Sequence, residues 1–302
     1  MTINKIGIIG LGLIGGTLAK TIHRIHPTIQ IIACDPNRDS LKQALSEGVI
    51  TQGFDSLSTD VDCSEREDTH KTGKDSAVSA LSSCRYIFLC APVQQNESFL
   101  ELLAPYLNEA CILTDTGSVK ASIHADVRTH GLSRYFIGGH PMAGREVGGY
   151  ESSTDTLFEK ASYLITPTER NKPENIALIR ELAEHIGCKH IVTTTAQEHD
   201  AIIAYTSQLM HVVAVALCDN PMIERSTFFS AGSLRDCTRV AVINEKMWSE
   251  LFLENKEELA NRISEMQNSL ENIKAALNNN DRDKLEEIMR HATQQKVKWL
   301  MN

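Results

Sequence analysis

The sequence lacks the marks of several large protein classes. Its 302 residues hold 30 Lys and Arg against 39 Asp and Glu, and this net charge of −9 argues against a nucleic-acid partner, which would favour a basic surface. No apolar run approaches the length of a bilayer span, and the first residues have the pattern of a strand rather than of a signal peptide. We therefore expect a cytoplasmic protein with no membrane partner.

The cysteines do not have the spacing of a disulfide framework. The eight cysteines are scattered, and no C-x-x-C pair occurs among them. Cys34, Cys90 and Cys111 fall in predicted buried strands, where a free thiol behaves as a small hydrophobic group. These patterns indicate a reducing compartment, and we expect no metal site.

A glycine motif follows the first predicted strand, residues 5–9. It has the form Gly-x-Gly-x-x-Gly and opens a predicted helix, and its members are Gly10, Leu11, Gly12, Leu13, Ile14 and Gly15. A second apolar run, residues 29–34, ends on Asp35, twenty residues after the motif. In this order of strand, glycines, helix, strand and acid, the glycines allow a tight turn and close approach to a pyrophosphate. The pattern predicts a dinucleotide site in which Asp35 accepts hydrogen bonds from the adenosine ribose.

The acid also bears on which dinucleotide binds. A carboxylate at position 35 repels a 2′-phosphate and favours NAD over NADP. Arg38 lies close enough in sequence to accept that phosphate, so NADP stays open as the less favoured cofactor.

The pattern of apolar and polar residues changes near residue 195. Before it, short apolar strands alternate with helical patterns, which is typical of a mostly parallel sheet; the further strands are expected at 85–90, 111–115, 135–137, 161–166 and 190–194. After it, long amphipathic helical patterns take over. We expect a Rossmann-type α/β domain over residues 1–195 and an all-helical domain over 196–302. Residues 55–74 are polar and read as a surface insertion.

Three polar segments follow predicted strand ends, where ligands bind in open α/β sheets. Ala91 and Pro92 follow one strand and either line the nicotinamide ribose or form an ordinary turn. Ser118 lies in the second segment, Asp115-Thr-Gly-Ser-Val-Lys, as an orienting hydroxyl or a plain turn or cap residue. His140 stands between glycines and a proline in the third. It is either a neutral imidazole suited to take the proton of an alcohol or a histidine hydrogen-bonded in a turn.

The helical half carries two further polar groups. Asp200, Ser207 and His211 form a stripe on an otherwise apolar helix, as a pocket wall or as satisfied core residues. Arg235 and Arg239 are four residues apart, so they either present a cationic face to a carboxylate or are ordinary surface charge.

Taken together, these motifs resemble those of the prephenate dehydrogenase family. The glycine motif is shared by many dehydrogenases, whereas the block Gly139-His-Pro-Met-Ala-Gly144, followed by a helical domain with Arg235-Asp-x-Thr-Arg239, is more specific. The resemblance implies NAD-dependent oxidative decarboxylation of prephenate to 4-hydroxyphenylpyruvate, in tyrosine biosynthesis, by a homodimer formed through the helical domain. Implied site residues are His140 as base, Ser118 as its support, and Arg235, His211 and Glu146 around the substrate.

Three alternatives remain at this point. An arogenate dehydrogenase would use the same chemistry on an amino-acid substrate. A β-hydroxyacid dehydrogenase would carry a catalytic lysine on the interdomain helix, but residues 205–215 contain none. A catalytically silent NAD-binding sensor would not need His140, Ser118 and Arg235 together.

Overall fold

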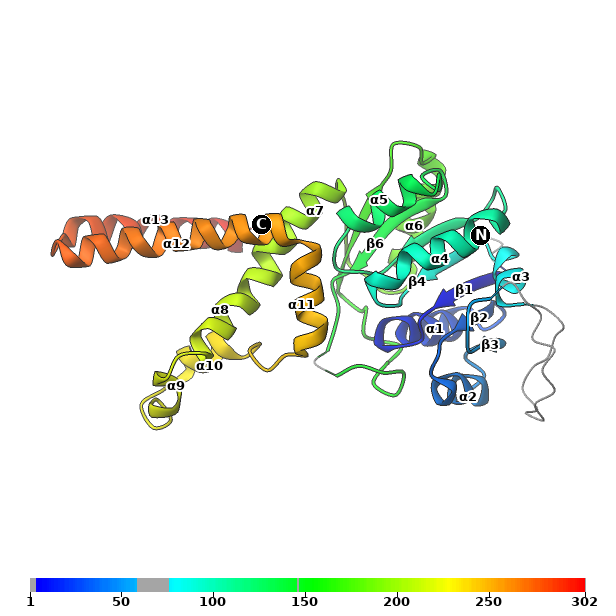
Figure 1. Ribbon diagram of the computed structural model, residues 1–302, viewed down its shortest axis with the longest axis horizontal. Helices are drawn as coiled ribbons and strands as arrows, with labels where there is room; N and C mark the ends of the chain where they lie inside the picture. Colours follow the sequence, from blue (N-terminus) through cyan, green and yellow to red (C-terminus); the bar gives the residue numbers. More distant parts are fainter. Residues whose placement is uncertain (1–3, 59–75, 146, 302) are drawn as a thin grey trace. The chain divides into compact units, whose positions relative to one another are not determined.

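The computed structural model describes residues 4–58, 76–145 and 147–301. The chain forms two compact units, Met1–Asp200 and Ala201–Asn302. The first carries the sheet and the second is built from helices (Figure 1).

The first unit is organised around one sheet of eight strands in the order β3-β2-β1-β4-β5-β6-β7-β8. Neighbouring strands pair in parallel except β6 with β7, which are antiparallel. The strands are β1 Lys5–Ile9, β2 Gln30–Cys34, β3 Gln52–Phe54, β4 Tyr86–Leu89, β5 Ile112–Asp115, β6 Phe136–Pro141, β7 Ser162–Pro167 and β8 His190–Thr193.

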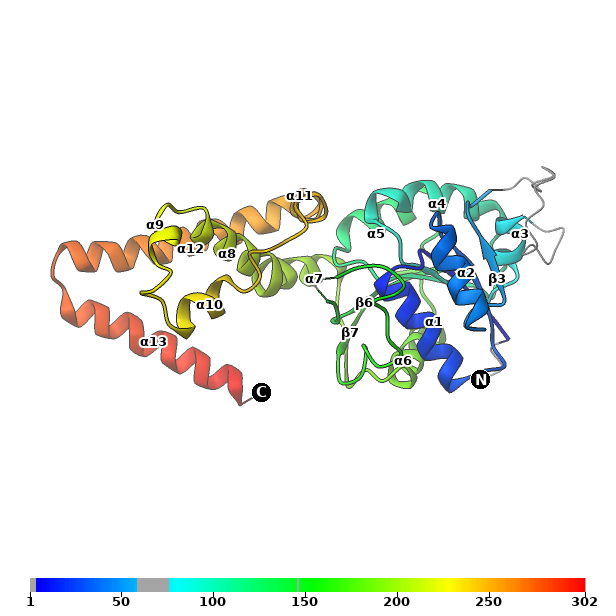
Figure 2. The same ribbon diagram turned by 90° about the horizontal axis from the view of Figure 1, so that it is seen from below.

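Helices cover both faces of this sheet. They are α1 Leu13–Ile25, α2 Arg38–Ser46, α3 Ala77–Ser82, α4 Asn96–Leu103, α5 Ala121–Thr129 and α6 Pro173–His185. Alternate strand residues point to opposite faces: Ile8 belongs to the core beneath α1 and α6, and Ile9 to the core beneath α4 and α5 (Figure 2). Burial on both faces explains why the strands are apolar throughout.

Two strands differ from the sequence expectation. β3 was not anticipated, because its three residues carry little strand pattern and are held by pairing with β2. β6 continues to Pro141 rather than ending at residue 137, because antiparallel pairing with β7 sustains it through two glycines. A side chain on Gly139 would meet the Tyr163 hydroxyl at 2.3 Å, so the glycine is required there. Residues 59–75, most of the expected polar insertion, lie outside the described residues.

The second unit contains helices and no strand among residues 201–301. Its α8 contacts α10 and α12, while α12 and α13 form a helical hairpin. The helices are α8 Leu209–Cys218, α9 Met222–Arg225, α10 Gly232–Thr238, α11 Glu245–Glu254, α12 Lys256–Asn278 and α13 Arg282–Leu300. Gln208 and Asn255, both buried, hydrogen-bond to each other at 2.8 Å and join the start of α8 to the α11–α12 junction.

One helical run corrects an expectation from the sequence. Helical conformation is continuous from Ala196 to Cys218 through α7 Ala196–Ile203, a π-helical turn Ala204–Gln208 and α8. Within the described residues it is one helix long and apolar enough to cross a bilayer, by length and composition only. Polar residues interrupt the apolar residues of this helix, so the sequence contains no long continuous apolar run there. The apolar window of this helix is 28% buried, and His199, Asp200 and Gln208 on the same helical run are buried and hydrogen-bonded to protein groups.

Candidate active site

The glycine loop at the carboxyl end of β1 has the geometry of a dinucleotide cradle. Gly10 has φ +95°, a conformation that side chains disfavour, and a side chain on Gly15 would lie 1.9 Å from the Gly10 carbonyl oxygen. In contrast, no described atom lies within 4 Å of the position that a Cβ on Gly12 would take. Gly12 is also the N-cap of α1, so the first amides of that helix face an open position that fits a pyrophosphate.

Asp35 lies directly beside this loop. One carboxylate oxygen accepts a hydrogen bond from the Leu11 amide at 2.5 Å, and the other accepts from the Asn37 amide at 2.8 Å. The carboxylate is therefore fixed next to the glycine turn at the end of β2, where an adenosine ribose would sit in this fold.

The segment after β4 adjoins the same loop. A side chain on Gly10 would lie 2.6 Å from the Ala91 amide nitrogen, so the two backbones are in close contact. Pro92 is the N-cap of the short 3-10 helix η1 Val93–Gln95. Ala91 and Pro92 thus border the glycine loop, and their contact with the nicotinamide ribose stays a prediction.

His140 lies in β6 with only 8% of its surface exposed. Its Nδ1 is 2.9 Å from Nε2 of His199, and Nδ1 of His199 is 2.7 Å from a carboxylate oxygen of Asp200. Both partners are in α7 and 1% exposed. The three side chains form a buried hydrogen-bonded row that ends at the His140 ring.

Asp200 also holds the loop between β5 and α5. Its two oxygens accept hydrogen bonds from the amides of Lys120 at 2.8 Å and Ala121 at 2.7 Å. These are amides at the start of α5, where a helix has unpaired N–H groups and its dipole favours a negative charge. The carboxylate therefore caps α5 from another part of the chain and stays oriented toward His199.

A buried ion pair also holds the loop between β5 and α5 in place. The Lys120 ammonium, with no exposed surface, lies 2.5 Å from a carboxylate oxygen of Asp115, which is 1% exposed. Asp115 further accepts hydrogen bonds from the amides of Gly117 and Gly139. The pair thus links the end of β5 to the residue that precedes His140.

These surroundings set the charge state of His140. Burial, followed by the positive charge of Lys120, holds the pKa of His140 well below its usual value of 6.5. The imidazole is therefore neutral at physiological pH, which is the state a general base requires.

The other expected site residues are placed as follows. Ser118 is half-buried in the β5–α5 loop, but the Nδ1 bond of His140 goes to His199 rather than to Ser118. His211 and Arg235 belong to the second unit, so their approach to His140 stays a prediction. The His211 ring stacks on Trp248 at 3.6 Å between centroids, and its Nδ1 is 3.0 Å from the Ser207 carbonyl oxygen. Arg235 is exposed on α10, and Glu146 lies outside the described residues.

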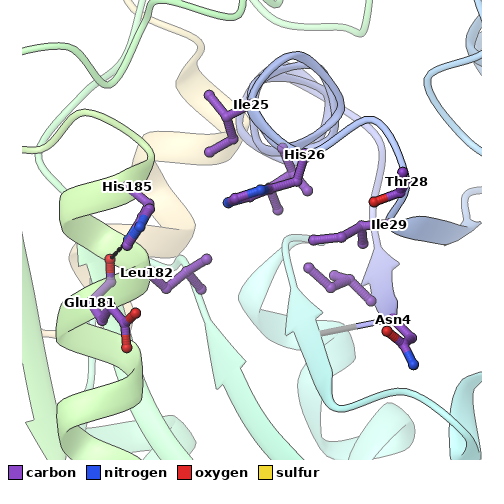
Figure 3. Close-up of a pocket in the computed structure, with 10 residues that line it drawn as sticks. Asn4, Ile25, His26, Thr28, Ile29, Glu181, Leu182 and His185 are labelled. Atoms are coloured by element: carbon purple, nitrogen blue, oxygen red, sulfur yellow. Dashed lines mark hydrogen bonds between the residues drawn. The ribbon is translucent and has the colours of Figure 1, made fainter. Parts of the chain in front are cut away.

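A separate cavity of about 280 Å³ lies at the opposite edge of the sheet (Figure 3). It is lined by α1, the turn before β2 and α6, with His26, Glu181 and His185 around it. The His185 ring is hydrogen-bonded to the Glu181 carbonyl oxygen. The cavity is near the amino ends of β1 and β2, whereas the glycine loop follows the carboxyl end of β1, so we assign the active site to the carboxyl edge.

Comparison with known proteins identifies the family of the chain. A model of the prephenate dehydrogenase nucleotide-binding domain matches residues 43–192, and a model of the prephenate dehydrogenase dimerization domain matches residues 195–291. A prephenate dehydrogenase of Bacillus subtilis is 30% identical over 91% of this chain and 71% of its own length. The chain belongs to the prephenate dehydrogenase family.

Solved structures of prephenate dehydrogenase relatives share the fold. One is a prephenate dehydrogenase from A. aeolicus in complex with hydroxyphenyl propionate and NAD⁺; it is 28% identical with a TM-score of 0.82, covering 100% of this chain and 99% of that one. Another is an arogenate dehydrogenase from Synechocystis, 26% identical with a TM-score of 0.81 over 98% and 99% of the two chains.

Sequence reasoning missed the residues that support His140. The sequence alone assigned no role to His199, which is 59 residues after His140, and it grouped Asp200 with Ser207 and His211 in a polar stripe rather than with His140. Their role depends on contacts between α7, β6 and the β5–α5 loop that no local pattern encodes. In the motif Asp115-Thr-Gly-Ser-Val-Lys120, Ser118 was selected from the sequence, whereas the structure shows a buried ion pair between Asp115 and Lys120.

Replacing Lys120 with Met leaves the Asp115 carboxylate buried with amide partners alone. Loss of one member of a buried ion pair costs about 3–5 kcal/mol in the free energy of unfolding. Lys274→Met is the control, because the Lys274–Glu271 pair is 66% exposed on both sides and such pairs contribute about 0–1 kcal/mol. Urea unfolding followed by circular dichroism measures both, and equal stability of the two variants would contradict the assignment.

Proposed function

We propose that the protein is an NAD-dependent prephenate dehydrogenase that forms 4-hydroxyphenylpyruvate for tyrosine biosynthesis in the cytoplasm. The observation that carries this proposal is the neutral, buried His140, held through His199 and Asp200 at the carboxyl edge of the sheet. Family membership supports the reaction class, and the match to a dimerization domain supports a homodimer.

The hydrogen-bonded row determines which nitrogen of His140 is the base. An ionised Asp200 only accepts hydrogen bonds, so His199 carries its proton on Nδ1. A neutral His199 then presents a lone pair at Nε2, and His140 donates its own Nδ1–H to it. In this assignment Nε2 of His140 carries the lone pair that receives the substrate proton.

The reaction of prephenate allows even a weak base to accept the 4-hydroxyl proton. This proton passes to His140 Nε2 while C4 is oxidised to a ketone. The C–CO₂⁻ bond then breaks, CO₂ leaves, and the electron pair of that bond moves through the ring to the C4 oxygen, which takes the proton back from His140 as the ring becomes a phenol. Bound NAD would supply the acceptor for the hydride that leaves C4. Loss of hydride makes the hydroxyl far more acidic, so an imidazole with a lowered pKa still accepts its proton. The imidazolium formed keeps its Nδ1–H bond toward His199.

The remaining assignments concern binding. Residues 10–15, Asp35, Ala91 and Pro92 would hold NAD, with NADP less favoured because of the Asp35 carboxylate. Arg235 would bind a substrate carboxylate through two parallel hydrogen bonds, and His211 and Glu146 would line the same pocket. Ser118 would contact the 4-hydroxyl, since the Nδ1 side of His140 is taken by His199.

The helical unit has the surface that a homodimer requires. Large apolar side chains are exposed on it, including Phe228 at 97%, Phe229 at 91% and Val242 at 92%. Exposed apolar surface of this extent marks an interaction site. A second copy of the chain, joined through this unit, is the partner we propose.

The proposal is tested by following NADH formation with prephenate and arogenate, each with NAD and NADP. We expect prephenate with NAD to give the highest kcat/KM. A preference for arogenate would keep the chemistry and change the substrate, a possibility that the Synechocystis relative represents. Binding of NAD with turnover of neither substrate would favour the sensor alternative.

His140→Asn removes the base but keeps side-chain size and some hydrogen bonding. We expect kcat to fall by about 10²–10⁴, with NADH affinity, measured by fluorescence titration, nearly unchanged. A near-normal kcat in the variant would refute the base assignment.

The pH dependence of the wild type tests the charge state of the same residue. The value of kcat/KM should stay constant as the pH falls through 6.5 and decline only below it, because the lowered pKa keeps His140 deprotonated there.

His199 acts through His140, so its two substitutions should differ. His199→Leu removes the acceptor for the His140 Nδ1–H and should lower kcat by at least about 10-fold, toward the order of 10⁴ seen when a catalytic histidine loses its tautomer partner. His199→Gln keeps an amide that accepts and donates and should recover part of that loss. KM for prephenate should change little in either. Equal effects of Leu and Gln would indicate a packing role only.

Arg235→Gln removes the guanidinium group that we propose binds a substrate carboxylate. The loss of a charge pair with a substrate carboxylate should cost about 2–5 kcal/mol in affinity, seen as a large rise in KM for prephenate with KM for NAD little altered. Arg239→Gln is the matched control, four residues along. If Arg235→Gln leaves KM for prephenate intact, another cation holds the carboxylate.

A further inference from the structure

The adenosine corner of the proposed cofactor site contains a second carboxylate besides Asp35. β2 and β3 are parallel neighbours in which Cys34 lies opposite Phe54, and the Asp35 amide donates to the Phe54 carbonyl oxygen at 3.0 Å. Asp35 and Asp55 are the next residue on each strand. They therefore lie at adjacent strand ends on the carboxyl edge of the sheet.

Asp55 is paired with Arg38, the arginine identified in the sequence as able to accept a 2′-phosphate. A guanidinium nitrogen of Arg38, the first residue of α2, lies 2.5 Å from a carboxylate oxygen of Asp55. The Arg38 side chain is 60% exposed and that of Asp55 33% exposed. The cation is accessible from solvent, but a negative charge of the protein already compensates it.

We propose that Asp55 is a determinant of cofactor choice that acts by engaging Arg38. This inference rests on the proposed dinucleotide site. A 2′-phosphate arriving at this corner meets the Asp35 carboxylate directly and finds Arg38 already paired, so NADP gains no free cation. A 2′-hydroxyl needs no such cation, and NAD is unaffected. Cofactor preference then has two separate sources, repulsion by Asp35 and occupation of Arg38 by Asp55.

The exposure of the pair favours this role over a structural one. Ion pairs accessible to solvent contribute little to folding, and β3 is held to β2 by its backbone ladder without it. Substituting Asp55 should therefore leave the fold intact while it releases the arginine.

The test measures binding directly, without substrate turnover. NADH and NADPH are titrated by fluorescence against the wild type, Asp55→Asn, Arg38→Gln and the double variant. We expect Asp55→Asn to tighten NADPH binding by about 2- to 5-fold, the order of one surface charge pair, with NADH changed less than 2-fold. In the Arg38→Gln background the same Asp55 substitution should give no gain.

Two controls sharpen the result. Glu271→Gln removes the acidic partner of Lys274 in a solvent-exposed ion pair of the other unit, and should alter neither affinity. The NADPH gain of Asp55→Asn should shrink as salt is raised, because a solvent-exposed cation is screened. Asp55→Ser, with circular dichroism to verify folding, provides a second variant at the position.

Several outcomes overturn the inference. Equal weakening of NADH and NADPH by Asp55→Asn would mean that Asp55 contacts the adenosine itself. A gain that persists without Arg38 would mean a general charge effect. Unchanged NADPH affinity with normal NADH binding would refute the role of Asp55 alone, whereas a wild type that binds neither nucleotide would refute the proposed function.

Discussion

The hydrogen bonds accepted by the Asp200 carboxylate are the interaction on which the rest of the site depends. The carboxylate caps α5 through the amides of Lys120 and Ala121 and at the same time binds the His199 ring, which binds His140. A carboxylate held by two amides at a helix start cannot rotate away without leaving those amides unpaired. The orientation of the proposed base is therefore tied to the folding of the β5–α5 loop and of α7, rather than to the glycine-rich strand that carries it.

A second constraint is the Asp115–Lys120 pair beneath the same loop. Two opposite charges buried together are tolerated because Asp115 also receives two amide hydrogen bonds. The positive charge of Lys120 in turn disfavours a charged His140 and contributes to its lowered pKa. The loop thus supplies both the position of the base and its charge state. The cofactor end of the sheet is arranged separately, around Gly10, Gly12 and Asp35.

The sequence predicted the fold class and the cofactor motif because these follow from local patterns: short continuous apolar strands, a glycine turn with fixed spacing, and amphipathic helices. It did not predict β3, whose three residues form a strand only beside β2, or the extension of β6 through Gly138 and Gly139 opposite β7. His140 was identified from its unusual surroundings in the chain. Its partner His199 was not, because 59 residues and the packing of three elements separate them.

The tautomer of His140 is the most direct test of this account. Long-range proton–nitrogen NMR spectra of ¹⁵N-histidine-labelled protein report which ring nitrogen carries hydrogen, and the His140→Asn variant assigns the signal. The account predicts a neutral ring at pH 7 with hydrogen on Nδ1 and a lone pair on Nε2. Hydrogen on Nε2 would mean that His199 is the donor, and a doubly protonated ring would mean that His140 is not a base at this pH. Either result would contradict the account.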